Sequence, residues 1–310
     1  MKTVRISRNY SEPDLFRQTP NCSAKWGDFI FTEHDTESDY LIILNKPDKD
    51  IASRFCKGGV ILFSQEPPYS KNNYYTSFYK FVDAVVTKGF NSSDAIQLDL
   101  PLGLPWLIDK SYDQLIDLKP GEKNNKICWI TSNSNINPGH QKRLDFLNFL
   151  KENNFKFDLY GRGFSPVKDK FPILYSCKYS INIENYSGND YFTEKMLDSL
   201  LCFTIPFYYG CKNIDKYFPK NSFVLIDINR PDYSMSLMSD IVNSNFWQEN
   251  YSAIEEARDL ILNKFQLFPL IANYLSQSKI SKKKKKYFIP SDGLTKIERL
   301  RKRVDLFFKK

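Results

Sequence analysis

Histidine is nearly absent from this sequence, with two in 310 residues, and the six cysteines stand singly, without a C-x-x-C pair. Structural zinc sites take four such ligands at short spacings, so we expect none. We interpret the cysteines as free thiols in a reducing compartment. No run approaches the roughly 18 apolar residues of a membrane span, and the N-terminus MKTVRISRNY lacks the apolar core of a signal peptide. We therefore expect the protein to stay where it is made.

An excess of basic residues is also lacking over most of the chain. The formal net charge is +8, but residues 279–310 hold thirteen Lys or Arg against three Asp or Glu, a net of +10. Residues 1–278 are left with a net charge of −2. A nucleic-acid-binding domain needs a basic face of its own, so no nucleic acid is expected as a partner.

Short apolar runs alternate with polar stretches in the first hundred residues. They are VRIS, FIFTEH, DYLIILN, GGVILFSQ and FVDAVVTKG. Such runs are typical of buried strands in a mainly parallel sheet. The polar stretch 109–125, which holds Pro120 and Gly121, then precedes a fresh strand. We place a domain boundary in this stretch, giving a first domain over residues 1–115.

Strands and helices alternate in the second region, residues 116–278. We expect strands at ICWITS, FKFDLYG, YSINIE, FTIPFYYG and SFVLID, with helices over 138–153, after Thr193 and over 246–277. This alternation predicts an α/β fold with a doubly wound sheet. Ligands of such sheets bind beyond the carboxyl ends of the strands.

Residues 279–310 form a third region that begins SKISKKKKK. From Ser291 onward, apolar residues recur at helical spacing among basic ones: Leu294, Ile297, Leu300, Val304, Phe307 and Phe308. The pattern predicts a basic amphipathic helix that binds an anionic membrane surface. A solvated tail, or a helix packed against its own protein, is the alternative.

The segment from Tyr179 to Gly210 is the richest in useful chemistry. It reads as a buried strand, a polar loop, a short helix and a second buried strand. Thr193, Glu194 and Lys195 fall at the helix start, where unpaired N–H groups and the positive end of the helix dipole favour an anion. A ligand that carries phosphate is the natural expectation.

These residues carry a resemblance to a known family. The pattern E-N-x-x-x-x-D-Y-x-T-E-K, from Glu184 to Lys195, resembles the donor-binding motif of the α1,3-fucosyltransferases, glycosyltransferase family ten, in its bacterial form. The likeness extends to TSNSNINPGHQKR, which contains Arg143, to FDLYGRG, and to SQEPP. The resemblance implies a GT-B architecture, in which two Rossmann-like domains face each other across a cleft. It also implies that GDP-fucose is the donor and that fucose moves to a glycan acceptor.

The resemblance also assigns roles in the second domain. It implies that Arg143 and Lys195 bind the diphosphate of the donor, and that Glu194 accepts hydrogen bonds from the ribose hydroxyls. Asn185 and Tyr191 would contact the sugar or the diphosphate. The resemblance adds three more residues to the donor site. Ser132 and Asn133 form the family's Ser-Asn sequence ahead of Arg143, and Glu184 begins the motif.

Two of the site residues leave alternatives open. Glu184 ends a strand, and either holds the following loop in place or reaches the fucose. His140 lies just ahead of Arg143, and either approaches a phosphate or is an exposed imidazole.

Glu66 is the candidate general base. It follows a buried strand in the first domain, and Pro67 and Pro68 prevent the chain from continuing as helix or ladder. A carboxylate at this point can take the proton from an acceptor hydroxyl.

The sequence also contains one D-x-D pattern, Asp48-Lys49-Asp50, a form that other glycosyltransferases use to hold Mn²⁺ or Mg²⁺. It lies far ahead of the donor motif, and Arg143 with Lys195 supply positive charge of their own. We therefore expect no metal at the site and no required cofactor.

The first hypothesis is an inverting α1,3-fucosyltransferase that transfers fucose from GDP-fucose to a glycan acceptor, an oligosaccharide or glycolipid. The acceptor hydroxyl would be O3 of N-acetylglucosamine, with O4 as the alternative. The enzyme would lie in the cytoplasm, on the inner face of a bacterial membrane. A second hypothesis keeps the fold but changes the nucleotide sugar. A third is a non-catalytic, membrane-associated binder of nucleotide or carbohydrate.

Overall fold

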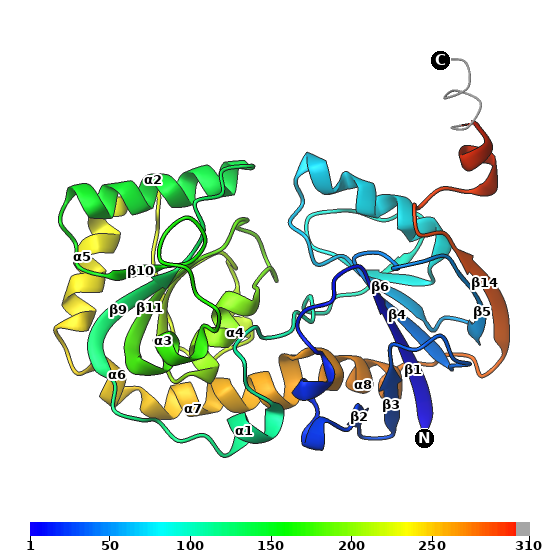
Figure 1. The fold of residues 1–310 in the computed structure, drawn as a ribbon, viewed down its shortest axis with the longest axis horizontal. Helices are drawn as coiled ribbons and strands as arrows, with labels where there is room; N and C mark the ends of the chain where they lie inside the picture. Colours follow the sequence, from blue (N-terminus) through cyan, green and yellow to red (C-terminus); the bar gives the residue numbers. More distant parts are fainter. Residues whose placement is uncertain (302–310) are drawn as a thin grey trace. The chain divides into compact units, whose positions relative to one another are not determined.

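The structure, a computed structural model, describes residues 1–301, apart from the side chains of residues 70 and 71. Contacts divide the chain into two compact units. The first unit contains Met1–Asp14, Ser23–Leu102 and the chain from Ile271 onward, and the second contains Leu15–Cys22 and Gly103–Leu270. Each is an α/β unit with a sheet of largely parallel strands, which confirms the predicted fold class (Figure 1).

The first unit is built on a seven-stranded sheet in the order β2-β3-β1-β4-β6-β7-β8. All neighbours are parallel except β2 and β3. The bounds are β1 Lys2–Arg8, β2 Lys25–Trp26, β3 Phe29–Thr32, β4 Tyr40–Leu44, β6 Val60–Phe63, β7 Ala84–Val86 and β8 Ile96–Gln97. The five apolar runs of the sequence become β1, β3, β4, β6 and β7, because strands buried on both faces need continuous apolar residues.

A second, two-stranded sheet in this unit corrects the prediction for the C-terminal region. Strand β14, Lys284–Ile289, pairs antiparallel with β5, Ile51–Cys56, instead of belonging to a separate basic tail. Tyr287 and Ile289 are buried, and the Tyr287 ring lies 6.0 Å from that of Phe55. Buried and exposed side chains alternate toward the end of β14, with the period of a strand. Burial of the apolar side chains therefore determines the structure of this segment despite its run of lysines.

The remaining part of the predicted tail is only partly described. Residues 296–301 are helical, with Ile297 and Leu300 exposed. The predicted continuation through Val304, Phe307 and Phe308 lies outside the described residues. No helix within residues 1–301 is long and apolar enough to cross a membrane.

The second unit is built on a five-stranded parallel sheet in the order β10-β9-β11-β12-β13. The strands are β9 Asn124–Ile130, β10 Asp158–Tyr160, β11 Cys177–Ile183, β12 Ile205–Tyr209 and β13 Val224–Leu225. The helices are α1 Tyr112–Ile116, α2 Pro138–Glu152, α3 Phe171–Ser176, α4 Glu194–Leu201, α5 Pro231–Val242, α6 Phe246–Glu249, α7 Tyr251–Leu260 and α8 Leu267–Gln277, which runs past the end of the unit. The predicted helix over 246–277 is thus broken into three.

Helices cover both faces of this sheet, as the doubly wound prediction requires. Side chains of α2 and α5, such as Phe146 and Met238, pack with Trp129 on one face. Side chains of α3 and α4, such as Leu174 and Leu197, pack with Cys128 on the other. Trp129 and Cys128 are successive residues of β9, so the alternation along one strand supplies both cores.

The division between the units differs from the predicted boundary at residue 115. Trp106, Ile108 and Leu115 are fully buried in a core of the second unit, so the chain joins that unit from Gly103 onward. The short segment Leu15–Cys22 joins it as well, because the Gln18 amide donates to the Trp106 carbonyl at 3.1 Å.

Candidate functional site

The predicted donor-site residues of the second unit gather at one edge of its sheet. Strands β9 and β11 are parallel neighbours, so their carboxyl ends meet at the same edge. Ser132 and Asn133 follow β9, and Glu184 and Asn185 follow β11. The structure therefore brings together two loops that are about fifty residues apart in the sequence.

Two glycines let the loop after β9 take its course. Gly161 has φ +113°, and a Cβ there would lie 1.9 Å from the carbonyl oxygen of Thr131. Gly163 has φ +85°, and a Cβ there would lie 2.1 Å from Cγ of Asn133. Only glycine fits such close approaches at positive φ. The predicted FDLYGRG segment thus supports the Ser-Asn loop.

Arg143 is the central cation of this edge. It lies on α2, whose first turn is capped by the Asn137 side chain. The guanidinium donates to Oδ1 of Asn185 at 2.7 Å and to the carbonyl of Ser132 at 3.1 Å, and thereby joins the two loops. Arg143 is 4% exposed, and its Nε has no hydrogen-bond partner within residues 1–301. Burial lowers the pKa of Arg143, while the Glu184 carboxylate opposes this effect.

Glu184 is tied to the motif loop by its hydrogen bonds. Its side chain is fully buried, and one oxygen accepts from the backbone N–H of Thr193 at 2.8 Å. The other oxygen accepts from the Thr193 hydroxyl at 2.8 Å and from Nζ of Lys195 at 3.1 Å. The Glu184 carboxylate therefore occupies part of the anion-binding site that the sequence predicts at the start of this helix.

Lys195 and Glu194 open toward solvent from the first turn of α4, with side chains 23% and 22% exposed. Burial opposes the charge on Lys195, but the carboxylates of Glu184 and Glu194 outweigh it and raise the pKa of the ammonium group. Burial likewise opposes the charge on Glu194, yet Lys195 and Lys170 lower its pKa to about 2. Both groups are therefore charged at neutral pH and available for polar ligand groups.

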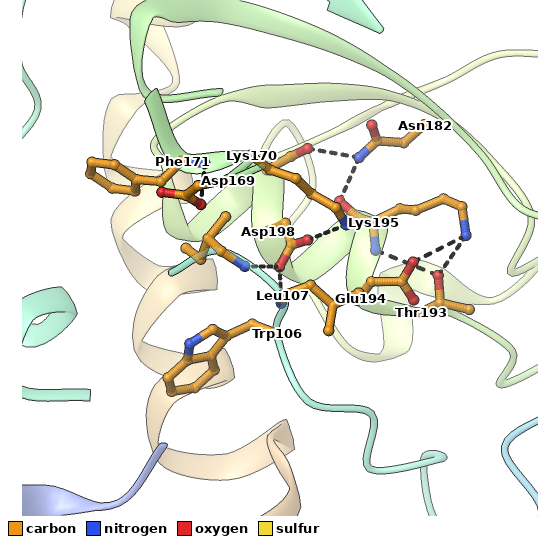
Figure 2. A network of polar contacts seen from close by, with 12 residues as sticks. Trp106, Leu107, Asp169, Lys170, Phe171, Asn182, Thr193, Glu194, Lys195 and Asp198 are labelled. Carbon is orange, nitrogen blue, oxygen red and sulfur yellow. Dashed lines mark hydrogen bonds and ion pairs between the residues drawn. The ribbon is translucent and has the colours of Figure 1, made fainter. Parts of the chain in front are cut away.

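A second ion pair, between Lys170 and Asp198 of α4, was not predicted from the sequence (Figure 2). Nζ of Lys170 lies 2.7 Å from Oδ2 of Asp198, and Oδ1 of Asp198 accepts from the backbone N–H of Leu107 at 2.7 Å. Asp198 is only 1% exposed. The sequence signal for this pair was Asp198 itself, an acid among the apolar residues of α4. A carboxylate at such a position is buried and needs a partner.

Tyr191 and His140 are both buried. Tyr191 is 3% exposed, and its ring packs edge-on against Tyr186 with centroids 5.3 Å apart. His140 is 7% exposed, so the expectation of an exposed imidazole is wrong. Its Nδ1 accepts from the backbone N–H of Ile136 at 3.3 Å, which closes the loop ahead of α2.

Glu66 belongs to the first unit, where it follows β6 and is half-buried. The residue before it is firmly held, since the Gln65 backbone N–H donates to Asn45 at 2.8 Å and its side chain accepts from the Tyr10 hydroxyl at 3.0 Å. Burial raises the pKa of Tyr75, and the charge of Glu66 raises it further. The Glu66 carboxylate thus lies close enough to the Tyr75 phenol to influence it, at the carboxyl end of a strand.

The two aspartates of the D-x-D pattern have separate partners in the first unit. Asp48 accepts from the Ser7 hydroxyl at 2.8 Å. Asp50 pairs with the Arg299 guanidinium at 2.8 Å, and these hydrogen bonds lower its pKa. Within residues 1–301 no group of three or more His, Cys, Asp or Glu side chains could hold a metal ion.

Comparisons with known proteins agree with the motif. The family described as "Glycosyltransferase family 10 (fucosyltransferase) C-term" matches residues 120–245. A mouse protein named 4-galactosyl-N-acetylglucosaminide 3-alpha-L-fucosyltransferase 9 is 30% identical over 129 residues, which is 40% of this chain and 35% of the mouse protein. The hamster protein of the same name (Cricetulus griseus) is 29% identical over the same length. The chain therefore spans about a third of the length of these relatives.

Among solved structures, an α1,3-fucosyltransferase with GDP-fucose matches 90% of this chain and 91% of its own, at 16% identity and a TM-score of 0.43. The matched family segment, residues 120–245, contains the β9 loop, Arg143 and the whole motif from Glu184 to Lys195. Residues 120–245 of this chain thus match the family model of glycosyltransferase family 10, the fucosyltransferases, and resemble the corresponding part of these relatives.

Proposed function

We propose that this protein is an inverting fucosyltransferase that moves fucose from GDP-fucose to a hydroxyl of a glycan acceptor. The observation that carries the proposal is the pair of cations, Arg143 and Lys195, at the carboxyl edge of the parallel sheet in the family segment. The name of the mouse relative describes 3-α-fucosylation of a galactosyl-N-acetylglucosaminide, which favours O3 of N-acetylglucosamine as the acceptor position.

The donor would bind with its diphosphate between Arg143 and Lys195. The Nε–H of the guanidinium has no partner among residues 1–301, and a planar fork of this kind binds phosphate oxygens in two contacts. Lys195 is a point charge on the same edge. Negative charge on the diphosphate grows as the bond to fucose breaks, so both cations stabilise the transition state more than the bound donor.

The other polar groups of the edge would position the donor. Glu194, ionised at neutral pH, accepts hydrogen bonds from the ribose hydroxyls. Asn185 and Tyr191 contact the sugar or the diphosphate. The loop of Ser132 and Asn133 completes the nucleotide site, while Glu184 acts through Lys195 and Thr193 rather than on the donor.

Glu66 would serve as the general base. It takes the proton of the acceptor hydroxyl while that oxygen attacks the anomeric carbon and the bond to GDP breaks, which inverts the configuration. Arg143 and Lys195 neutralise the leaving diphosphate. On this mechanism no metal ion and no other cofactor is required.

The test is transfer from GDP-fucose to N-acetyllactosamine in the presence of EDTA, with product detected by mass. Glu66→Ala should abolish product and leave GDP affinity, measured by calorimetry, nearly unchanged. Glu152→Ala removes an exposed carboxylate at the end of α2 and is the matched control, with activity retained. Equal activity in wild type and Glu66→Ala would refute the role of Glu66 as the base.

Two alternatives give different results in the same assay. If another nucleotide sugar is the donor, GDP-fucose gives no product while the Arg143 and Lys195 site still binds a nucleotide. If the protein is a non-catalytic binder of nucleotide or carbohydrate, no donor gives product, and Glu66→Ala changes no nucleotide-dependent property.

We also propose that the C-terminal region binds an anionic membrane surface at the cytoplasmic face of a bacterial membrane. Lys282, Lys283 and Lys286 are exposed, and Ile297 and Leu300 add exposed apolar surface. Because β14 is part of the first unit, the test removes only residues 302–310. Loss of binding to phosphatidylglycerol vesicles, with transfer to a soluble acceptor retained, supports the proposal; unchanged vesicle binding counts against a role for these nine residues.

A further inference from the structure

The second unit has a groove at the edge of its sheet opposite the donor residues. It has a volume of about 710 Å³ and is lined by the start of β9, by residues 153–158 and by α5. This volume lies within the range of small-molecule sites. Asn125 lines the groove near the start of β9, while Ser132 follows the end of that strand, seven residues later, a separation of roughly 20 Å in extended chain. The groove is therefore distinct from the donor site.

The floor of the groove is partly aromatic. Phe155 and Phe157 are half-buried, with ring centroids 6.5 Å apart, and Phe157 also packs on Trp129 at 5.8 Å. Met235 and Val242 of α5 add apolar surface. Because Phe157 packs on Trp129, the rings form a rigid apolar surface. Binding a ligand to this surface costs little side-chain entropy.

One wall of the groove is a polar stripe on α5. Ser236, Ser239, Asp240 and Asn243 recur at the i, i+3, i+4, i+7 spacing of one helix face, and all four line the groove. All four are exposed, and their side chains make no hydrogen bond or ion pair within residues 1–301. The wall thus offers hydroxyl, amide and carboxylate groups to a ligand.

The electrostatics of the groove disfavour an anionic ligand. Both α2 and α5 end at the groove, with Asn153 and Asn243 just beyond them. The C-terminal end of a helix carries partial negative charge. Lys126 is already paired with Asp158 at 3.3 Å, and the other two charged residues of the lining, Lys156 and Asp240, carry opposite charges. A nucleotide or other phosphate would therefore meet no net positive charge.

We propose that this groove binds a neutral oligosaccharide. The apolar faces of sugar rings pack on Phe155 and Phe157, and sugar hydroxyls donate to Asp240 and exchange hydrogen bonds with the serine and asparagine side chains of α5. The idea that this saccharide is a distal part of the acceptor rests on the proposed function. The groove itself does not require it.

The direct test is NMR titration of the full chain, saturated with GDP, with a hexasaccharide of three N-acetyllactosamine units. Backbone signals of residues 153–158 and 235–243 should shift. Ser239→Trp fills the groove from an exposed helix position and should weaken this binding about tenfold or more. Asp232→Trp, at an exposed position of α5 that does not line the groove, is the matched control and should bind like wild type.

Kinetics provide the second arm. In Ser239→Trp the KM for the hexasaccharide should rise about tenfold, with kcat and the KM for the N-acetyllactosamine disaccharide unchanged. Transfer without any shift of the groove signals overturns the groove proposal alone. Groove shifts without transfer leave it standing and count against the proposed function. An oligolysine peptide that shifts these signals where the saccharide does not also overturns it.

Discussion

At the scale of single residues, the site depends on how buried charges are paired. Arg143 joins the two loops through Asn185 and Ser132, while Glu184 ties Thr193 to Lys195. Charges that the structure buries this deeply are stable only with partners. Lys195, which is partly exposed to solvent, is held in place by Glu184 and Thr193, which are both buried.

Glu184→Gln should lower the free energy of unfolding by about 3 kcal/mol, because it leaves the Lys195 ammonium without its buried counter-charge. The measurement is urea unfolding followed by tryptophan fluorescence. Glu152→Gln, at an exposed position, is the control and should unfold like wild type. A Glu184→Gln protein as stable as wild type would show that the loop does not need this carboxylate.

At the scale of elements, two short segments are held by lysines. Nζ of Lys123 donates to the carbonyls of Tyr175 and Cys177, at 2.9 and 2.8 Å, and so closes the end of α3. Nζ of Lys285 lies 3.0 Å from Asp83 and attaches β14 to the first unit. The lysine run 282–286 was predicted to belong to a basic tail, yet Lys284, Lys285 and Lys286 form part of strand β14.

Lys123 should make stability depend on alkaline pH. Burial lowers its pKa from 10.5 to about 8, so between these values the unfolded chain binds more protons than the folded protein. The free energy of unfolding that Lys123 contributes therefore rises with pH in this window and is lower below pH 8.

The measurement is the difference in unfolding free energy between wild type and Lys123→Met. From pH 7 to pH 10 this difference should change in favour of wild type by about 2 kcal/mol. Lys119→Met, at an exposed position, controls for the other groups that titrate at high pH. Parallel pH curves for wild type and Lys123→Met would contradict the argument.

Strand β14 should be required for the first unit to fold stably. Ending the chain after residue 281 removes the partner of β5 and uncovers Phe55 and Ile51, and should lower the thermal midpoint by several degrees or abolish folding of this unit. Ending it after residue 301 keeps β14 and should leave the midpoint unchanged. Equal midpoints for both truncations would mean that β14 adds nothing to stability.

At the scale of the whole molecule, the predicted site residues are divided between the two units. All eight predicted donor residues belong to the second unit, and Glu66 belongs to the first. GDP alone should therefore protect backbone amides of residues 131–145 and 184–196 from hydrogen exchange and leave those of residues 60–66 unchanged. Protection confined to the first unit would place the nucleotide site elsewhere.

Much of this organisation could be predicted from the sequence because it is local. The apolar runs determined the strands β1, β3, β4, β6 and β7, and the motif from Glu184 to Lys195 indicated the family model that matches residues 120–245. The residues on which these predictions rest are close together in the chain. The period of a strand and the start of a helix can therefore be recognised from neighbouring residues alone.

Only the tertiary structure decided the partners of groups that are distant in sequence. It paired Asp198 with Leu107 and Lys170, buried Tyr191 and His140, and added the lysine-rich strand β14 to β5. Each of these outcomes depends on which surfaces of the chain meet on folding. Burial and charge pairing at those surfaces then decide the structure, even where the polarity or the period of the isolated segment predicts another.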